Sequence, residues 1–519
     1  MRMMTVVHDV IIIGAGAARL GAARCWTDHQ KGPPPMLILE ARDRIGGRVR
    51  QGQLPSGGDD VVKVDLGANW IHNMVQENPC LALAQKRNSV LIRTSTDHDP
   101  DANDTLLFDP HSKQPISKHQ FEKFSKLFHK VWDLMEMVWE EEHDDYQLLR
   151  QLRKLKVDEA FRVVLETRLD CPFPSPTSNH DILIEEEAIR NERLLRWFLD
   201  RMSISWAYPM RELSVKKYMQ FGDDEGDSPE GEALVEGGFS PLIIEDLATG
   251  LNVQKSHVVT HISRLKETTS ASGKNALISV KGYVAPSPTN DNKSNGKHHD
   301  KDDVASFEYI CKSCIVTLPP TCLREKGMLS FSPPLPRRKV KAWEKAQMGL
   351  LNLVILQFDH VFWPEDTNFI GIMSPHSTVT LPPNSSLEES SSCTGFCLFT
   401  NMYKTTKEPI LMAQTFGDFA AYIESIPEQS VAELAMDAIR KGAFPDAPDP
   451  MACLRSTWLS DPFSQGSYLA TGACRDMAQS CWDGTLRFAG EATDEEDFGV
   501  VSCAINSGIR EAKALLKII

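Results

Sequence analysis

The sequence predicts an α/β fold, α+β over the whole chain, and three observations lead to this class. A β-branched run from Val10 to Ile13 is followed by a glycine-rich turn, an Ala-rich stretch and a second apolar run, as in a strand–helix–strand unit. Apolar residues then recur at steps of three and four between 118 and 201, as in amphipathic helices. Short apolar runs at 315–318 and 353–358 predict further strands. The chain has 519 residues, which is enough for two or three domains.

The first unit predicts a dinucleotide site. The unbroken apolar run before Gly14 is expected of a parallel strand buried on both faces. Gly14 allows the tight turn, and Gly16 lets the backbone approach a pyrophosphate at the helix N-terminus. Glu40 ends the second strand, where its carboxylate can accept hydrogen bonds from a ribose. The alternative is a strand–helix–strand unit that serves packing only.

One position departs from the glycine fingerprint. The pattern has a third glycine where helix and strand pack closely, and this chain has Arg19 there. Two outcomes stay open at this stage. Either Arg19 pairs with the pyrophosphate, or it pushes the helix away from the strand.

The charge balance excludes some partners. The chain has 56 Lys and Arg against 71 Asp and Glu, a net charge of −15, which argues against nucleic acid or an anionic membrane as the main partner. We find no apolar run of about 18 residues and so expect no membrane span. The sequence shows no signal-peptide pattern and ends in Lys517-Ile518-Ile519, which is not a peroxisomal address, so we expect a cytoplasmic protein.

The 12 cysteines are scattered, which suits reduced thiols better than a disulfide framework. Cys311 and Cys314 form a C-x-x-C beside a predicted strand. No second pair stands at zinc spacing, so buried small residues are favoured over metal or redox chemistry, and no metal site is expected.

Further segments follow in order along the chain. Residues 64–72 contain Gly67 and Ala68, small residues that suggest a backbone passing close to a flat group. Residues 118–201 form a predicted helical block. Its core stripe consists of Phe121, Phe124, Phe128, Val131, Met135 and Val138.

In the second half of the sequence, the pattern predicts that the chain re-enters the nucleotide-binding domain. A short helix is expected at 240–249, and residues 285–303 and 382–392 lack the composition of a core and are expected to be disordered insertions. Near the C-terminus a strand leads to Glu491, and a helix at 502–516 follows. The N-terminus of that helix is therefore expected to face the ligand of the first turn.

Taken together, these motifs resemble the flavin-dependent amine oxidases, and most closely the polyamine and spermine oxidases, with histone demethylases and monoamine oxidases further away. The resemblance covers nearly the whole chain. It is carried by Gly14-x-Gly16, Glu40-Ala41-Arg42-x-Arg44-x-Gly46-Gly47-Arg48, 65–72, Gly237-Gly238, Thr317-Leu318-Pro319, Trp458-x-x-Asp461-Pro462, 466–468, 488–493 and Ser507-Gly508-x-Arg510.

The resemblance implies two domains, each built from discontinuous segments. A Rossmann-type FAD-binding domain would comprise residues 1–75, 208–325 and 452–519. A substrate-binding domain of mixed sheet and helices would comprise 76–207 and 326–451.

The resemblance also implies which residues bind FAD. Glu40 would take the ribose, Arg42 and Arg48 the phosphate region, and residues 67–70 the isoalloxazine. The full implied set is Gly14, Gly16, Ala18, Arg19, Glu40, Arg42, Arg48, Gly67, Ala68, Asn69, Trp70, Val259, Trp458, Gly490, Glu491, Val500 and Val501. Of these, Val259 would meet the adenine, Trp458 the ring, and Val500 and Val501 the pyrimidine edge.

The implied reaction is carried by the cofactor. A neutral amine loses a hydride from its α-carbon to flavin N5, water hydrolyses the imine, and O2 reoxidises the flavin to give H2O2. His72 is the titratable residue expected to accept a proton or hydrogen bond from the substrate amine, although a histidine merely packed at a domain junction is the alternative. The implied substrate-binding residues are Trp70, His72, Tyr468, Asp497 and Phe498.

Besides Arg19, three positions depart from the family pattern. Leu353 stands at a catalytic position where the family has a lysine that hydrogen-bonds through water to flavin N5. An apolar side chain cannot donate that bond, so oxygen activation or imine hydrolysis is expected to be weaker or altered. Asp497 stands at the usual tyrosine and either pairs with a distal ammonium or forms a turn that leaves Phe498 to stack. Cys503 adds bulk where a glycine lets the flavin edge approach.

These departures keep two other hypotheses open. One is a degenerate oxidase scaffold that binds a partner, and the other is an oxidase of a secondary-metabolite amine or an amino acid. The expected partners are a small-molecule amine and O2. The sequence leaves the oligomeric state open.

Overall fold

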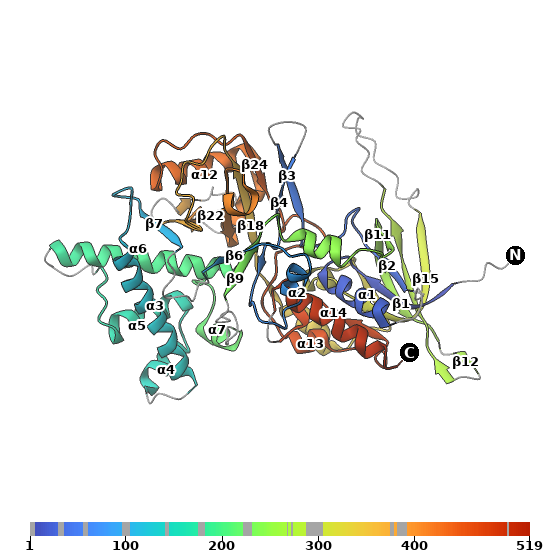
Figure 1. Ribbon diagram of the computed structural model, residues 1–519. Helices are drawn as coiled ribbons and strands as arrows, with labels where there is room; N and C mark the ends of the chain where they lie inside the picture. Colours follow the sequence, from blue (N-terminus) through green and yellow to red (C-terminus); the bar gives the residue numbers. More distant parts are fainter. Residues whose placement is uncertain are drawn as a thin grey trace.

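The computed structural model describes residues 6–29, 36–55, 61–95, 104–140, 145–174, 182–221, 231–266, 268–270, 273–286, 305–373, 378–380, 392–495 and 498–518. These residues form two main sheets, each with its own helices. Segments far apart in the sequence build each sheet (Figure 1).

The first sheet has eight strands in the order β10-β2-β1-β15-β14-β11-β16, with β26 beside β15. Its central strand β1 is parallel to both of its neighbours. The strands are β1 (Val7–Ile13), β2 (Met36–Leu39), β10 (Val253–Gln254), β11 (His257–Arg264), β14 (Ile278–Val284), β15 (Ser306–Val316), β16 (Ser330–Ser332) and β26 (Leu486–Phe488).

Helices cover both faces of β1, which is why its apolar run is unbroken. Val10 and Ile12 pack with α1 (Ala17–His29) and α14 (Val501–Leu515). On the other face, Ile11 and Ile13 pack with α9 (Arg337–Lys345) and α13 (Cys474–Ala478). The predicted parallel strand buried on both faces is confirmed.

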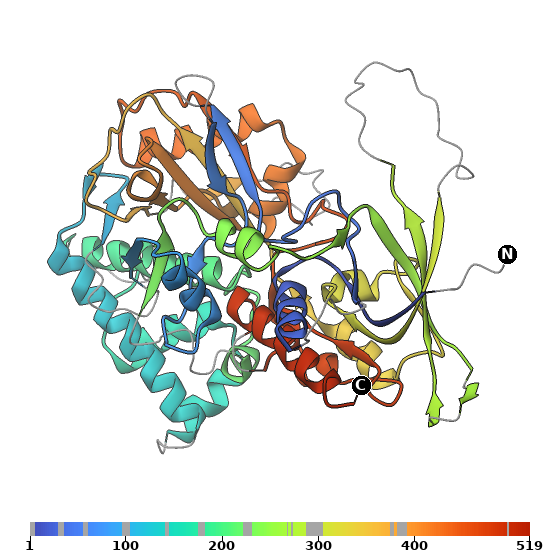
Figure 2. The same ribbon diagram turned by 45° about the vertical axis from the view of Figure 1, so that its right-hand side comes forward.

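Helices α1 and α14 lie side by side, blue and red in Figure 2, and approach at backbone distance. A Cβ on Gly508 would lie 1.8 Å from the carbonyl oxygen of Ala18, and one on Gly21 would lie 2.7 Å from that of Ile505. Only glycine fits at these two contacts. They hold the N-terminal end of α1 close to the last helix.

The second sheet has seven strands in the order β24-β18-β23-β22-β19-β7-β8. One face packs on α11 (Gly417–Ser425) and α12 (Glu428–Gly442), and the other faces the helical block. The strands are β7 (Thr105–Asp109), β8 (Gln114–Pro115), β18 (Leu351–Gln357), β19 (Phe369–Ile372), β22 (Leu398–Asn401), β23 (Ile410–Phe416) and β24 (Ala452–Arg455).

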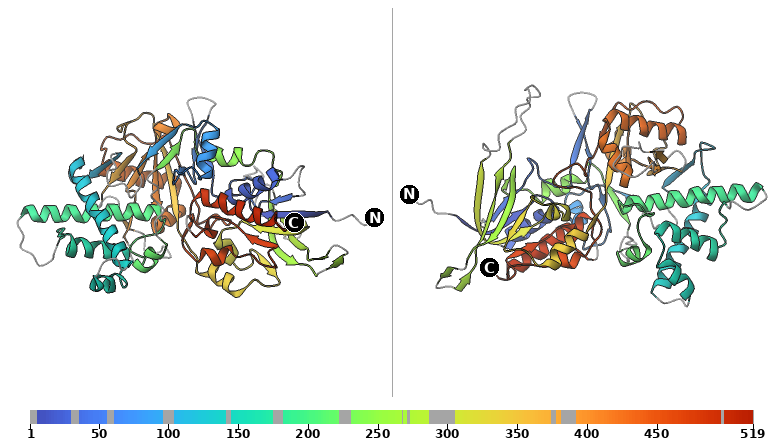
Figure 3. Two further views of the ribbon diagram at one scale, coloured as in Figure 1. Left: turned by 60° about the horizontal axis from the view of Figure 1, so that its bottom comes forward. Right: turned by 180° about the vertical axis from the view of Figure 1, so that it is seen from behind.

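The helical block lies at the end of the molecule away from the N-terminus (Figure 3). It contains α3 (Lys118–Trp139), α4 (Tyr146–Leu152), α5 (Val157–Arg168), α6 (Ile182–Ser205) and α7 (Val215–Phe221). A capping box between Ser117 and Gln120 starts α3. All six residues of the predicted stripe on α3 are buried, so the predicted block and its core are confirmed.

Smaller elements connect the two sheets. The predicted helix at 240–249 is present but shorter, because it runs from residue 240 to residue 246 and is π-helical from residue 242. The small elements are β3 (Gln51–Pro55), β4 (Val61–Asp65), β5 (Trp70–Ile71), β6 (Leu91–Thr94), β9 (Glu232–Val235), β12 (Thr268–Ser270), β13 (Gly273–Asn275), β17 (Gln347–Met348), β20 (Thr378–Thr380), β21 (Ser392–Thr394), β25 (Leu469–Thr471), α2 (Pro79–Lys86), η1 (Leu242–Asp246), α8 (Pro320–Arg324), α10 (Tyr403–Thr406) and η3 (Glu491–Thr493).

Three elements near the predicted domain boundaries pack with the sheet of the other predicted domain. β16 and α9 lie beyond residue 325 and pack with the first sheet, whereas β24, which begins at 452, belongs to the second. The predicted insertions at 285–303 and 382–392 lie almost entirely outside the described residues. Within the described ranges, no helix combines the length and apolar character needed to cross a bilayer.

Candidate active site

A cavity of about 690 Å³ is lined by residues of both sheets and of the helical block. It brings together most of the residues that the sequence singles out. The predicted site residues on its wall are Gly14, Gly16, Ala18, Glu40, Arg42, Arg48, Gly67, Ala68, Asn69, Trp70, His72, Val259, Leu353, Trp458, Tyr468, Gly490, Glu491, Phe498, Val500 and Val501.

The glycine turn forms one end of the cavity. Gly14 has φ of 101°, and its amide donates to the carbonyl of Leu39 at 2.9 Å, which fixes the turn against the end of β2. A Cβ on Gly16 would find its nearest atom, the Gly46 carbonyl oxygen, only at 4.0 Å. The space beside Gly16 is therefore open to a ligand at the start of α1.

Glu40 lies at the end of β2, 3% exposed. The backbone amide of Arg42 donates to its Oε1 at 2.9 Å. Burial raises the pKa of Glu40, against the lowering effect of that hydrogen bond and of the Arg42 and Arg19 charges. The carboxylate is thus held in place beside the cavity, with acceptor capacity for a hydroxyl.

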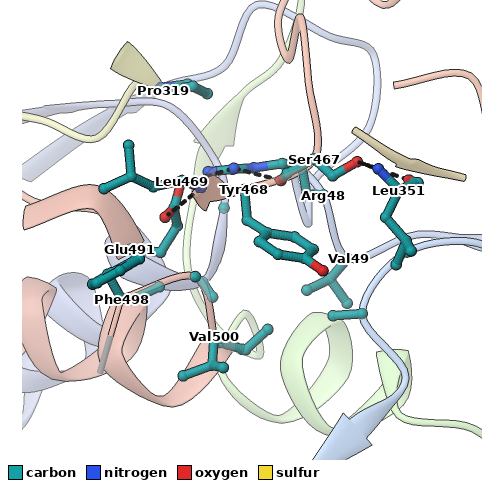
Figure 4. A pocket seen from close by; sticks show the side chains of 18 of the residues that line it. Arg48, Val49, Pro319, Leu351, Ser467, Tyr468, Leu469, Glu491, Phe498 and Val500 are labelled. Atoms are coloured by element: carbon teal, nitrogen blue, oxygen red, sulfur yellow. Dashed lines mark hydrogen bonds and ion pairs between the residues drawn. The ribbon is translucent and has the colours of Figure 1, made fainter. Parts of the chain in front are cut away.

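Two arginines in the wall are held by ion pairs to the C-terminal part of the chain. Arg42 binds Asp461 at 2.6 Å, and Arg48 binds Glu491 at 2.9 Å. Arg48 also donates to the carbonyl of Ser467 at 2.6 Å (Figure 4). These pairs join segments more than 400 residues apart and give this end of the cavity a network of charges.

Residues 67–70 pass close to other backbone. A Cβ on Gly67 would lie 1.9 Å from the Arg48 carbonyl oxygen and 3.2 Å from the Trp458 ring. The amide of Asn69 donates to the sulfur of Met412 at 3.0 Å, and the indole of Trp70 donates to the Thr94 hydroxyl at 3.2 Å. This loop therefore lines the cavity between Trp458 and Met412 of the second sheet.

His72 lies on the same wall and pairs with a carboxylate. Its Nδ1 contacts Oε1 of Glu232, and its side chain is 42% exposed. Asn78 donates to the backbone carbonyl of His72 at 2.6 Å and so fixes the main chain at this point. The Glu232 carboxylate holds the imidazole orientation with Nδ1 as the donor.

The ring of Tyr468 projects into the cavity (Figure 4). Its hydroxyl donates to the carbonyl of Ser205 at 2.8 Å, at the end of α6. Phe498 and Val500 lie nearby, at the start of α14. Asp497 lies outside the described residues, so both hypotheses for it stay predictions.

Comparison with known proteins identifies the family. Residues 17–516 match the family described as flavin containing amine oxidoreductase. The chain belongs to this family. The predictions of the family and of FAD as the cofactor are thus confirmed.

Plant polyamine oxidases are similar to this amine oxidoreductase along most of their length. It is 29% identical to polyamine oxidase 4 of Oryza sativa subsp. japonica over 97% of this chain and 88% of that protein. It is 27% identical to polyamine oxidase 2 of Arabidopsis thaliana over 99% and 89%. A histone demethylase homologue of Arabidopsis thaliana, lysine-specific histone demethylase 1 homolog 3, is also 27% identical, but over only 30% of its own length.

Among solved structures, this amine oxidoreductase is similar to putrescine oxidase bound to putrescine. The TM-score is 0.63 and the sequence identity 16%, with 99% of this chain and 100% of the other covered. This likeness confirms the predicted fold class, a Rossmann-type domain joined to a second domain of mixed sheet and helices.

The wall of this amine oxidoreductase has room for the flavin cofactor. Gly490 has φ of 139°, and a Cβ there would meet no atom within 4 Å, although its neighbours Ala489 and Glu491 are buried. Gly16 is open in the same way. Two bare backbone positions on one cavity wall form the cradle that a large ligand needs close to the main chain.

Arg19 is not part of this wall. It is 0% exposed, and none of its three guanidinium nitrogens has a hydrogen-bond partner among the described residues. Burial lowers its pKa from 12.5 to about 9, although the charge of Glu40 acts to raise it. The structure therefore does not bring Arg19 to the cavity, where the sequence predicted a cofactor contact. The chain accommodates the side chain inside, with α1 still tightly packed on α14.

The other residues that depart from the family pattern, and the C-x-x-C pair, lie at different places relative to the cavity. Leu353 lies on the cavity wall, 2% exposed. Cys503 is not among the described residues that line the cavity, and its thiol donates to the carbonyl of Val500 at 2.9 Å. Cys311 and Cys314 are fully buried in β15, where burial raises both pKa values, and no metal-binding cluster occurs within the described ranges.

Sequence reasoning missed several residues of the site. Asp65 is buried, and its carboxylate accepts from the amides of Phe239 and Ser240 at 2.6 and 3.0 Å, which fixes the turn after β9. Its place at the start of the 65–72 motif was a usable signal. Glu232 and Gln414 carried no signal of their own, because only the tertiary fold brings them to the wall.

Proposed function

We propose that this chain is an FAD-dependent oxidase of polyamines, such as spermine, spermidine or their acetylated forms, with O2 as the electron acceptor and H2O2 as a product. The observation that carries the proposal is the His72–Glu232 pair, which lines the same cavity as the glycine turn. The similarity to plant polyamine oxidases along nearly the whole chain supports it.

In this proposal FAD lies along the first sheet. The adenosine end would meet Glu40 and Val259, the pyrophosphate would lie at Gly16, and the ring would lie against Trp458. The remaining wall residues would hold the cofactor as the sequence predicts, with Arg19 left out. The bound flavin supplies a hydride acceptor.

In this proposal the substrate would occupy the part of the cavity that three carboxylates line. Glu232 of β9 lines it together with Asp133 and Glu136 of α3. Carboxylates at one end of a partly enclosed cavity attract cations and favour a second ammonium group on the substrate. A linear diamine or polyamine carries such a group at a distance from the nitrogen that reacts.

His72 would select the uncharged nitrogen. With Nδ1 donating to Glu232, Nε2 carries the lone pair and accepts a hydrogen bond or a proton from the substrate amine. Hydride loss requires the neutral amine, so this acceptor favours the reactive form. Tyr468 and Trp458 would exclude water around the reacting carbon.

The test is anaerobic reduction of the bound flavin. Spermine, spermidine and their acetylated forms are each mixed with the purified protein in a stopped-flow instrument. The readout is the loss of flavin absorbance at about 450 nm, the usual flavin maximum. Bleaching by at least one of them is expected, and His72→Asn should slow it by roughly 10²-fold. Absence of bleaching with every polyamine sinks the polyamine proposal.

A second candidate is an oxidase of amino acids. Arg201 lines the cavity and its guanidinium lies 5.5 Å from the centre of the Phe369 ring. A guanidinium is the group that holds a carboxylate in a bidentate pair. Bleaching by amino acids but not by polyamines would select this candidate. Bleaching by neither would favour the scaffold without oxidase activity, for which Leu353 on the wall is the supporting observation.

A further inference from the structure

Gln414 is a polar side chain on an otherwise apolar part of the cavity wall. Among the described residues, the strands of the second sheet contribute five residues to this wall. They are Leu351, Leu353, Phe369, Leu398 and Gln414. Gln414 alone among them can donate or accept a side-chain hydrogen bond.

Strand register fixes where Gln414 points. In the antiparallel pair of β18 and β23, Gln414 stands directly opposite Leu353, so both side chains project from the same face of the sheet. Met412 and Phe416, two residues away on either side, pack in the apolar cluster on that face. Gln414 therefore interrupts an apolar row at the point where the row borders the cavity.

The row also borders the wall made by residues 67–70. Asn69 donates to the sulfur of Met412, and Met412 is the neighbour of Gln414 on this face. The carboxamide of Gln414 therefore lies on the part of the cavity next to residues 67–70. In the proposed function, the flavin ring occupies this part.

A partly buried amide costs free energy unless a ligand or water satisfies it. We propose that Gln414 is a positioning residue for the flavin, which its carboxamide hydrogen-bonds directly or through one water molecule from the second sheet. It supplies the polar group that Leu353 lacks on the neighbouring strand. This inference rests on the proposed placement of FAD, and it does not depend on which amine is oxidised.

The experiment is sulfite titration of the holoprotein, because sulfite adds to flavin N5 without any amine or oxygen. A hydrogen-bond donor near the ring stabilises the anionic adduct. Gln414→Met keeps the length of the side chain and removes the amide, so the sulfite Kd should rise roughly three- to tenfold, the range expected for one neutral hydrogen bond. The visible spectrum of the bound flavin should shift as well.

Thr400→Val is the matched control. Thr400 stands opposite Met412 on the same face, is buried, and does not line the cavity. Removing its hydroxyl should leave both the sulfite Kd and the flavin spectrum unchanged. The double variant Leu353→Lys/Gln414→Met should recover the wild-type Kd to within about twofold, because a donor returns from the adjacent strand.

Two further outcomes separate this inference from the proposed function. An unchanged sulfite Kd and spectrum in Gln414→Met would overturn the role of Gln414, whichever amines bleach the wild-type flavin. A raised Kd together with no bleaching by polyamines would leave Gln414 in place and sink the polyamine proposal. If Gln414→Met does not fold, Gln414→Asn retracts the amide by one methylene and must raise the Kd for the inference to stand.

Discussion

Two arginines on α1 show that the contribution of a side chain to folding stability depends on its hydrogen-bond partners. Arg19 is fully buried, and its guanidinium nitrogens have no hydrogen-bond partner among the described residues. Arg24, five residues later, donates to the carbonyls of Asp246, Leu247 and Thr249 at 3.3, 3.1 and 2.7 Å. The same side chain is thus unsatisfied at one position and satisfied at the other.

Replacing Arg19 should therefore stabilise the protein. Met has a helix propensity close to that of Arg and a similar length, so Arg19→Met removes the buried charge with little other change. We expect the free energy of unfolding to rise by about 1–3 kcal/mol. Arg24→Met should lower it by about 1 kcal/mol, because three carbonyls lose their donor. Thermal midpoints measured side by side check this, and a fall in Arg19→Met equal to that in Arg24→Met would contradict it.

At the scale of elements, α9 holds a lysine inside the first domain. Lys339 is 1% exposed, and its Nζ donates to the carbonyl of Met477 at 2.5 Å and lies 3.8 Å from the centre of the Phe488 ring. Burial lowers its pKa from 10.5 to about 8, while the charges of Cys481, Glu511 and Asp476 act to raise it. The charged form of Lys339 is therefore disfavoured in the folded protein.

This lowered pKa predicts a pH-dependent stability. Between pH 8 and 10.5 the unfolded chain binds more protons at Lys339 than the folded one, so folded stability rises with pH in that window. Relative to Lys339→Met, the wild-type protein should gain about 3 kcal/mol across it. Denaturant midpoints of both proteins at pH 7, 8.5 and 10 measure the difference in stability between the wild-type protein and Lys339→Met. Arg338→Met, on the exposed side of α9, should show no such trend, and a flat difference for Lys339→Met would refute the prediction.

The sequence predicts those elements that local patterns encode, but not the contacts between distant segments. The turn at Gly14, the strand ending in Glu40 and the stripe on α3 follow from local periodicity, and the structure confirms these elements. The side chains that complete the wall follow from pairing between distant segments. Glu232 reaches His72 across 160 residues, and Gln414 faces the cavity only because of its register with Leu353. Likewise, no local rule distinguishes a buried Arg19 from one that reaches the cavity.

At the scale of the whole molecule, the cavity depends on contacts between two parts: the segments around the first sheet, and the second sheet with the helical block. Tyr468 directly precedes β25, the strand that pairs with β17, and its hydroxyl donates to the carbonyls of Ile204 and Ser205 at the end of α6 in the helical block. Both carbonyls lie in the last turn of a helix, where intrahelical donors run out, and the Ile204 carbonyl accepts a second hydrogen bond from the amide of Ala207 at 3.0 Å. The tyrosine therefore joins the segment before β25 to the helical block while its ring lines the cavity.

Tyr468→Phe should loosen this connection without removing the ring. The two carbonyls lose a donor, and the end of α6 becomes free to move relative to the wall that carries His72. We expect kcat/KM for the best amine to fall roughly tenfold, about 1.4 kcal/mol, with the FAD content unchanged. Tyr146→Phe, at a tyrosine that is 65% exposed, is the control and should leave the kinetics as they are. A Tyr468→Phe enzyme with wild-type kcat/KM would show that the two parts are aligned without this hydroxyl, through contacts such as the hydrogen bond from Asn69 to Met412 of the second sheet.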